Sequence, residues 1–466
     1  MQASPEARMR ASTAFLIMAP MVIVTLLFVG TQGRRAGAAG GGGGQPYWDE
    51  GVAAFVRQRM GSTYVDPLDA KASEAAFWRA MDAYVRLDPY CDMIPPSEYR
   101  QWKEGTSGHY GGLGIRVDAE AEGLRVRGVL PGGPAQRAGL QVGELVLGAD
   151  GRALGGMDLR SGTPARLLKG APGSSVRLEV RAASGEVRVL VATREVVRPP
   201  AVFTRRVGPQ GKVAVLRLSE FVESTPAEVD EALAALLSVP TEGLVLDLRD
   251  NAGGVLAAAV HVADRFLPAG LVVRVVGRAA GTSRDFHAKA SDDAAEVPAG
   301  LPVAVLVNGH SASASEVVSG ALQDHRRALL VGERTFGKFL VQSIVEAPRG
   351  DCALQLVTAR YVTPSGRSYQ RRLEDGPPGP AQAEEGVDAR GEPAGLLPDV
   401  VQALSAEERK RLLQHWDHEE DARWGAPPRH AGVTEGWVDP QLARALEVLE
   451  GELLMQRIRP GASPAR

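Results

Sequence analysis

Three serines, Ser311, Ser313 and Ser315, stand where an apolar run gives way to a helical pattern. The run Val303 to Val307 is typical of a buried strand, and an Asn-Gly pair interrupts it. Serines at a strand-to-helix junction lie near unpaired backbone N–H groups and the positive end of the helix dipole. Because this setting suits a nucleophile, the stretch predicts a serine hydrolase that acts on peptides.

A serine hydroxyl needs a base, and the sequence offers two kinds. His310 adjoins the serines and Asp324-His325 follows downstream, so a Ser-His-Asp triad is conceivable. Lys338 lies between a glycine and three apolar residues, which favours burial of its amine. A buried lysine loses its proton more easily, because desolvation disfavours the charged form. Residue chemistry alone does not decide whether histidine or lysine is the base, or which of the three serines is the nucleophile.

The composition argues against several other classes of protein. The chain has 466 residues, of which 44% are hydrophobic and 23% charged, with a net charge of −3. It is long enough for two or three domains, and it lacks the basic excess of a nucleic-acid-binding protein. No histidine or cysteine cluster has metal-ligand spacing, so we expect neither metal nor cofactor. Cys91 and Cys352 lie far apart in the sequence and are expected to be separate thiols.

Residues 1–44 are expected to be a targeting segment. Two arginines, Arg8 and Arg10, precede an apolar run from Ala14 to Gly30, and a glycine tract ends the segment. Both a signal peptide cleaved after Ala38 and an uncleaved membrane anchor fit this pattern. Either one predicts an extracytoplasmic protein, periplasmic or secreted, and the anchor would hold it at the inner membrane.

The rest of the chain is predicted to form four regions. Residues 45–107 have the spacing of amphipathic helices, and residues 108–198 contain a series of short strands. Residues 199–402 alternate strands with helices, which favours an α/β layer with a largely parallel sheet. Residues 403–466 form a C-terminal helical extension and tail.

The second of these regions resembles a PDZ domain. Gly133 to Glu144 reads G-P-A-x-x-A-G-L-x-x-G-E, and A-D-G follows at Ala149 to Gly151. In such domains a glycine-rich loop binds a peptide's C-terminal carboxylate through backbone N–H groups, and the peptide adds as a strand. A plain hairpin turn is the alternative interpretation of the glycines. The residues that the resemblance implies in peptide binding are Gly112, Leu113, Gly114 and Ile115.

The serine-rich stretch resembles the active site of the C-terminal processing peptidases, which are PDZ-containing proteases with a Ser-Lys pair. It reads S-A-S-A-S-E-V-V-S-G-A-L-Q-D, followed by T-F-G-K-x-x-V-Q. The resemblance implies Ser313 as nucleophile, Lys338 as base and Gln342 as the residue that orients the lysine. If this stretch is helical, Lys338 and Gln342 share a face. Glu316 matches a family acid but also completes a capping box with Ser313, so a catalytic role and a capping role are both open as alternatives.

The resemblance also implies an oxyanion site. Its donors would be the backbone N–H of Ala314 and that of Gly253 or Gly254, in the loop D-L-R-D-N-A-G-G. The alternative is that Asn251 merely caps the following helix. The implied fold is multidomain α/β and α+β. It has a crotonase-like α/β protease core, a mostly β PDZ domain and a helical N-terminal lead-in.

The implied activity is cleavage of unfolded or tagged polypeptides near their free C-termini through an acyl-enzyme. Further motifs occur in the family order: L-D-P-Y at 87–90, Y-V-T-P-S-G-R-S at 361–368 and L-P-D-V at 397–400. Three residues depart from the family pattern: Phe339 replaces a glycine, Cys91 a serine and Lys169 an arginine. Because Phe339 departs from the family pattern beside the lysine, one alternative to a peptidase stays open: a catalytically degenerate PDZ adaptor that only binds peptides.

Overall fold

The computed structural model describes residues 69–458, apart from residues 87, 89, 157–166, 279–280, 290–295, 349, 372–393 and 427–435. The predicted targeting segment and the first part of the predicted helical lead-in lie outside these residues. Within the described part, no helix has both the length and the apolar character needed to span a bilayer. The chain forms two compact units.

The smaller unit combines residues up to Tyr99 with Gln342–Val357. Helix α3 (Ala70–Val85) precedes strand β1 (Asp92–Ile94), and α4 (Pro96–Ser107) begins in this unit. Strand β1 pairs antiparallel with the first half of β18 (Ala353–Val362), which also pairs with β17 (Leu340–Glu346). Cys91 and Cys352 are both buried free thiols, which confirms the expectation that they are unbridged.

A six-stranded sheet forms the centre of the larger unit, in the order β10-β11-β12-β15-β16-β19. Strands β10 and β11 are antiparallel, and every other neighbouring pair is parallel, which confirms the predicted largely parallel sheet. The bounds are β10 (Val202–Val207), β11 (Val213–Leu218), β12 (Gly243–Asp247), β15 (Val303–Val307), β16 (Leu329–Gly332) and β19 (Val400–Val401).

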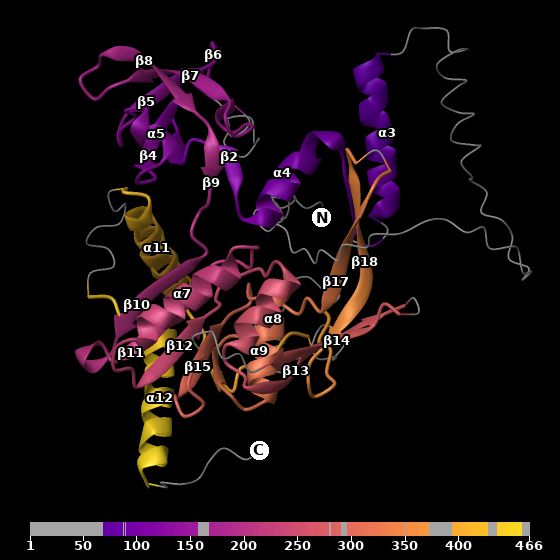
Figure 1. The fold of residues 1–466 in the computed structure, drawn as a ribbon, viewed down its shortest axis with the longest axis vertical. Helices are drawn as coiled ribbons and strands as arrows, with labels where there is room; N and C mark the ends of the chain where they lie inside the picture. Colours follow the sequence, from indigo (N-terminus) through magenta and orange to yellow (C-terminus); the bar gives the residue numbers. More distant parts are fainter. Residues whose placement is uncertain are drawn as a thin grey trace, which may run out of the picture. The chain divides into compact units, whose positions relative to one another are not determined.

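Helices cover both faces of this sheet (Figure 1). Side chains alternate between the faces of a strand, so Leu244 and Leu246 of β12 point to one core while Val245 points to the other. The first core also contains apolar residues of α7 (Thr225–Leu237), α8 (Leu256–Asp264) and α9 (Ala314–Asp324). The second core contains apolar residues of α12 (Pro440–Ile458), which packs on the opposite face of the sheet. A strand buried on both faces explains the continuous apolar runs in the sequence.

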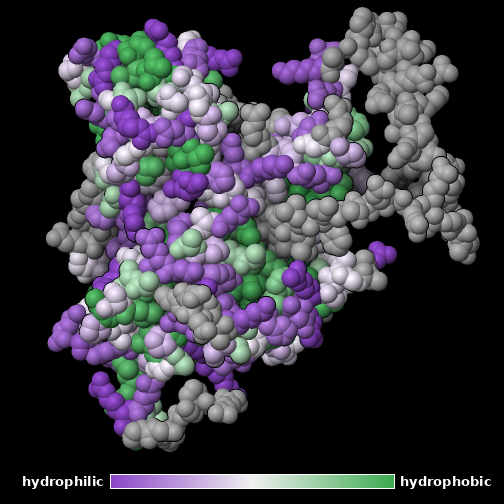
Figure 2. All heavy atoms as spheres, viewed as in Figure 1, coloured by the Kyte–Doolittle hydropathy of each residue, from purple (hydrophilic) through white to green (hydrophobic). Residues whose placement is uncertain are grey.

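A second sheet of the larger unit is antiparallel. In it β13 (Ala269–Gly277) pairs with β14 (Arg284–Lys289) on one side and with the second half of β18 on the other. The C-terminal extension contains α11 (Ala406–Arg423) as well as α12. On the face drawn in Figure 2, hydrophilic and hydrophobic side chains are interspersed over the described surface.

The strands between residues 115 and 193 form their own antiparallel sheet, in the order β3-β4-β5-β7-β8 with β6 beside β5, around a separate apolar core, and β2 pairs with β9 in a two-stranded sheet. In the described part of the chain β3 pairs with β4 alone and is an edge strand of this sheet. The bounds are β2 (Tyr110–Gly112), β3 (Ile115–Ala119), β4 (Leu124–Val129), α5 (Pro134–Arg137), β5 (Leu145–Ala149), β6 (Arg152–Ala153), β7 (Ser175–Arg181), β8 (Val187–Thr193) and β9 (Glu195–Val197).

Candidate active site

Three loops meet at one edge of the parallel sheet. Residues 248–255 follow β12, residues 308–313 follow β15, and residues 333–339 follow β16. These three strands are adjacent and parallel, so their carboxyl ends lie side by side. In open α/β sheets this edge is where ligands bind. The fold therefore brings together the predicted oxyanion loop, the serines and the segment that contains Lys338.

The hydroxyls of the three serines have different surroundings. Ser311 Oγ donates to the Leu248 carbonyl at 2.8 Å and accepts from the Asn308 N–H at 2.9 Å. Ser315 Oγ donates to the Asn251 carbonyl at 2.8 Å. Ser313 Oγ is also buried, yet it has no hydrogen-bond partner among the described residues. Two of the serines thus fasten the serine loop to the loop after β12, whereas the Ser313 hydroxyl bonds no loop carbonyl and lies beside the phenol of Tyr361.

The backbone of Ser313 is strained. It has φ 54° and ψ −110°, a combination that residues other than glycine rarely adopt. The residue directly precedes α9, at the positive end of that helix. A sharp, strained turn of this kind presents a nucleophile at the edge of an α/β sheet.

Glu316 holds this turn and the lysine loop together. Its buried carboxylate accepts from the Ser313 N–H at 2.8 Å, which is the contact expected of a capping box. It also accepts from Thr335 Oγ1 at 2.6 Å and from the N–H groups of Gly337 and Lys338 at 2.7 and 2.8 Å. Burial raises the pKa of the Glu316 carboxyl, and these donors act in the opposite direction. The carboxylate has four hydrogen bonds, all to groups that position the site.

Lys338 lies on the loop that Glu316 holds. Its side chain is partly buried, and burial lowers the pKa of its amine to about 8, while the Glu316 carboxylate acts in the opposite direction. The next residue, Phe339, is 2% exposed and packs into the core, with its ring edge-on to Tyr369. The aromatic replacement of glycine is therefore accommodated in the protein interior.

The helical geometry suggested for Lys338 and Gln342 is wrong. Leu340–Glu346 forms strand β17, and Lys338 lies in the loop before it. Gln342 belongs to the smaller unit, is buried, and donates through Nε2 to the carbonyl of Tyr90 in the L-D-P-Y motif. Tyr90 of this motif thus holds the side chain of Gln342.

The histidines do not form a triad with the serines in the described structure. The ring of His310 makes no hydrogen bond to any of the three, and burial lowers its pKa while Asp250 acts in the opposite direction. Asp324 accepts from the Ser365 N–H at 2.8 Å and pairs with Arg367, both in the 361–368 motif. His325 contacts the carbonyl of Leu271 instead.

The loop after β12 lies against the serine turn. A β-carbon built on Gly253, whose φ is 101°, would lie 2.9 Å from Ala314 N and 3.0 Å from Ser313 Cβ. One built on Gly254, with φ 144°, would lie 1.9 Å from the Phe221 carbonyl oxygen. Both positions therefore require glycine, because a side chain at residue 253 would collide with the serine turn and one at residue 254 with the backbone of Phe221.

Asn251 shapes this loop and does not cap the next helix. Helix α8 begins at Leu256 and its N-cap residue is Val255, so the capping alternative is wrong. The Asn251 side chain donates to the Leu218 carbonyl and accepts from the Gly253 N–H, both at 2.9 Å. Of the predicted oxyanion donors, Gly253 thus has an acceptor within the loop. The N–H groups of Ala314 and Gly254 have none among the described residues.

Several groups of the site were not predicted from the sequence. Thr335 and Asn251 fix the loops through side-chain contacts that no local pattern reveals. Tyr361, in a motif noted only for its resemblance, is buried and donates its N–H to the Phe339 carbonyl. Burial raises the pKa of its phenol above the usual range, and the neighbouring Ser313 hydroxyl acts in the opposite direction.

The predicted peptide-binding loop forms the turn between β2 and β3. Gly112, Leu113 and Gly114 are buried, and Ile115 begins the edge strand. The carbonyls of Leu113 and Gly114 accept hydrogen bonds from Ala135 and Leu130, within the same small domain. The Lys169 amine lies 4.2 Å from the centroid of the Tyr110 ring, as a cation–π contact.

Comparisons with known proteins agree with this arrangement. Residues 212–375 match peptidase family S41, and residues 125–182 match a PDZ domain. The carboxy-terminal-processing protease of Bartonella bacilliformis is 36% identical over 320 residues, which cover 67% of this chain and 70% of that protein. The carboxyl-terminal-processing protease of Picosynechococcus sp. is 36% identical over 281 residues, 59% of this chain and 66% of the relative.

A solved structure of a photosystem II D1 C-terminal processing protease aligns with 75% of this chain and 86% of its own, at 29% identity and a TM-score of 0.41. The sequence matches show that the chain belongs to peptidase family S41, the family of the carboxy-terminal-processing proteases. It is a serine peptidase with a PDZ domain. In the described residues, no group of three or more histidines, cysteines or acids is placed to hold a metal ion.

Proposed function

We propose that this chain is an endopeptidase that cleaves unfolded or tagged polypeptides near their free C-termini, through a Ser-Lys acyl-enzyme. One observation carries the assignment of the nucleophile. Of the three buried serine hydroxyls at the strand-to-helix junction, only Ser313 Oγ is not tied to a loop carbonyl, and its neighbour is the phenol of Tyr361. Its turn is joined through Glu316 to the loop that contains Lys338.

In the proposed mechanism, Ser313 Oγ attacks the scissile carbonyl carbon while Lys338 takes the hydroxyl proton. A lysine with a pKa of about 8 is neutral often enough at physiological pH to do so. When the tetrahedral intermediate collapses, the C–N bond breaks and Lys338 returns the proton to the leaving amine. Water then attacks the acyl-enzyme with Lys338 again as base. Gln342 is proposed to orient the lysine, as in the family.

The oxyanion of the intermediate is proposed to bind the N–H groups of Ala314 and of Gly253 or Gly254. The closeness of Gly253 to Ala314 N supports this assignment. A donor within hydrogen-bond distance of the developing charge contributes about 3–4 kcal/mol. Gly253 would take this role only by exchanging Asn251 Oδ1 for the substrate oxygen, whereas the Gly254 and Ala314 N–H groups need no such exchange.

The PDZ domain is proposed to bind the substrate's C-terminal carboxylate at Gly112, Leu113, Gly114 and Ile115. The edge position of β3, which begins at Ile115, supports the addition of a peptide strand. Because these contacts use the backbone, they fit many sequences, as degradation of unfolded chains requires.

The finer organisation is part of the same proposal. We assign a helical lead-in to residues 45–107, a PDZ domain to 108–198, a crotonase-like protease core to 199–402 and a C-terminal extension to 403–466. Residues 1–44 are proposed to export the chain, as a signal peptide or as an inner-membrane anchor, on the strength of their apolar run. The peptidase would then act outside the cytoplasm.

Cleavage of matched peptides tests this function. Two peptides of one unfolded sequence, one with a free C-terminal carboxylate and one amidated, are incubated with the enzyme. Charge-assisted contacts to a carboxylate are worth about 1.5–3 kcal/mol, so we expect the KM of the amidated peptide to be about ten- to one-hundredfold higher. Equal KM values would contradict PDZ capture. Binding of the free peptide without cleavage under any condition would favour the catalytically degenerate adaptor.

A further inference from the structure

A buried arginine lies at the base of the loop that contains Gly253 and Gly254. The side chain of Arg249 is fully removed from solvent, and each of its five N–H groups has an acceptor. Asp247, at the end of β12, accepts from Nε at 2.9 Å and from a terminal nitrogen at 2.6 Å. This pair alone would leave three N–H groups without an acceptor.

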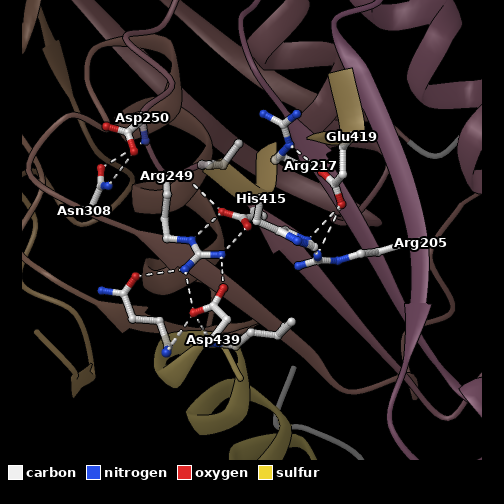
Figure 3. A network of polar contacts seen from close by, with 12 residues as sticks. Arg205, Arg217, Arg249, Asp250, Asn308, His415, Glu419 and Asp439 are labelled. Carbon is white, nitrogen blue, oxygen red and sulfur yellow. Dashed lines mark hydrogen bonds and ion pairs between the residues drawn. The ribbon is translucent and has the colours of Figure 1, made fainter. Parts of the chain in front are cut away.

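The remaining acceptors come from the C-terminal part of the chain. The Asp439 carboxylate, 190 positions after Arg249, accepts from both terminal nitrogens, at 3.1 and 2.7 Å. Gln441 Oε1 accepts from one of them at 3.0 Å. Figure 3 shows Arg249 facing Asp439 at the start of α12.

Asp439 is itself held in place. Its Oδ1 accepts from the N–H groups of Gln441 and Leu442, at 3.1 and 3.2 Å, and so caps the first turn of α12. Leu442 and two further apolar residues of α12 pack on the sheet, so the helix is firmly docked. Burial raises the pKa of Asp439, but the Arg249 guanidinium outweighs this and holds it below its usual range. The carboxylate that faces Arg249 is therefore charged.

The next residue of the loop, Asp250, contacts a different C-terminal helix, α11. Its φ of 55° lies in the left-handed region, and its carboxylate pairs with Arg409 of α11 and accepts from Asn308 Nδ2 at 3.2 Å. Further along α11, Glu419 pairs with arginines of β10 and β11 (Figure 3). Two C-terminal helices thus contact consecutive residues at the base of the loop.

We propose that Asp439 is a positioning residue of the peptidase site, which acts through Arg249 to keep residues 250–254 against Ser313. This inference rests on the function proposed above. Without the Asp439 carboxylate, two of the five N–H groups of Arg249 lose their charged acceptor, and of the C-terminal acceptors only Gln441 remains. The guanidinium is then held by Asp247 and Gln441 but no longer tied to the Asp439 carboxylate at the start of α12, and the oxyanion donors beside Ser313 lose their alignment.

The variant Asp439→Asn tests this role, because asparagine caps a helix as well as aspartate does but removes the charge. With fluorescein-labelled casein as substrate, we expect kcat to fall about ten- to one-hundredfold and KM to change less than about twofold. The matched control is Arg444→Ala on the same helix, which removes an exposed pair with Glu447 and should leave kcat unchanged. A kcat for Asp439→Asn equal to that of the control would overturn the proposal.

Hydrogen–deuterium exchange gives a second readout that does not depend on activity. In Asp439→Asn, the backbone amides of residues 250–255 should exchange about tenfold faster, while those of α12 are unchanged. Unchanged exchange in the loop, or faster exchange throughout α12, would contradict a positioning role. If the unaltered protein cleaves nothing, the proposed function fails, and the exchange result still decides the role of Asp439.

A double-variant cycle tests whether Asp439 acts through Arg249. Arg249→Lys keeps the charge and loses the forked geometry. If the effect of Asp439 passes through Arg249, the kcat of the double variant should be no lower than that of the less active single variant. Losses that multiply would show that Asp439 acts by another route.

Discussion

Ser313→Ala will reduce kcat/KM for an unfolded substrate by about five to six orders of magnitude, as expected when the nucleophile of a serine peptidase is removed. The fold should be unaffected, because Ser313 Oγ ties no loop of the described chain in place and has only the Tyr361 phenol beside it. Replacing the strained serine with alanine leaves the turn as it is, so the melting temperature should change little. Cleavage of labelled casein and thermal unfolding measure the two effects.

The neighbouring serines provide the controls. Ser311→Ala and Ser315→Ala each remove a buried hydrogen bond to a loop carbonyl, so each should lower the free energy of unfolding by about 1–2 kcal/mol. Their kcat/KM should stay within about tenfold of the unaltered enzyme. A variant of either serine that is inactive while Ser313→Ala remains active would refute the assignment of the nucleophile.

Lys338→Met will reduce kcat by about 10,000-fold, because the methionine side chain keeps the length of the lysine stem but cannot accept a proton. The same substitution at Lys212, an exposed lysine paired with Glu242, should have no effect on kcat. His310→Ala should also remain active, since its ring makes no hydrogen bond to any of the three serines in the described structure. Activity that survives in Lys338→Met and is lost in His310→Ala would show that histidine is the base.

The larger organisation of the fold could be predicted because it depends on patterns within each segment. Apolar runs such as Val303–Val307 predict strands that are buried on both faces, and the structure places these strands in the parallel part of the sheet. The meeting of the three loops also follows, since adjacent parallel strands end at one edge.

The choice among the serines depended on the family resemblance, and the structure shows why local chemistry could not make it. The acceptors of Ser311 and Ser315 are the carbonyls of Leu248 and Asn251, more than 60 positions earlier in the chain. A hydroxyl with a distant backbone partner looks the same in the sequence as one without. The role of Arg249 is hidden in the same way, because its second carboxylate lies 190 positions away.

Two alternatives that the local pattern left open are ruled out for physical reasons. Spacing of four suggested a helix for Lys338 to Gln342, but the segment rich in β-branched and apolar residues pairs with β18 as a strand. Asn251 was a plausible helix cap, but its side chain is committed to the Gly253 N–H and the Leu218 carbonyl. In both cases tertiary contacts outweigh the local preference.

The most direct test of the Ser-Lys mechanism is the pH dependence of the acylation rate, measured before the steady state between about pH 6 and pH 10. The base must be deprotonated to act, and burial lowers the pKa of Lys338 to about 8. Acylation should therefore be slow at pH 6, rise through a midpoint near 8, and level off above it. A rate that is already constant above about pH 7 would indicate a histidine-like base and would contradict the account.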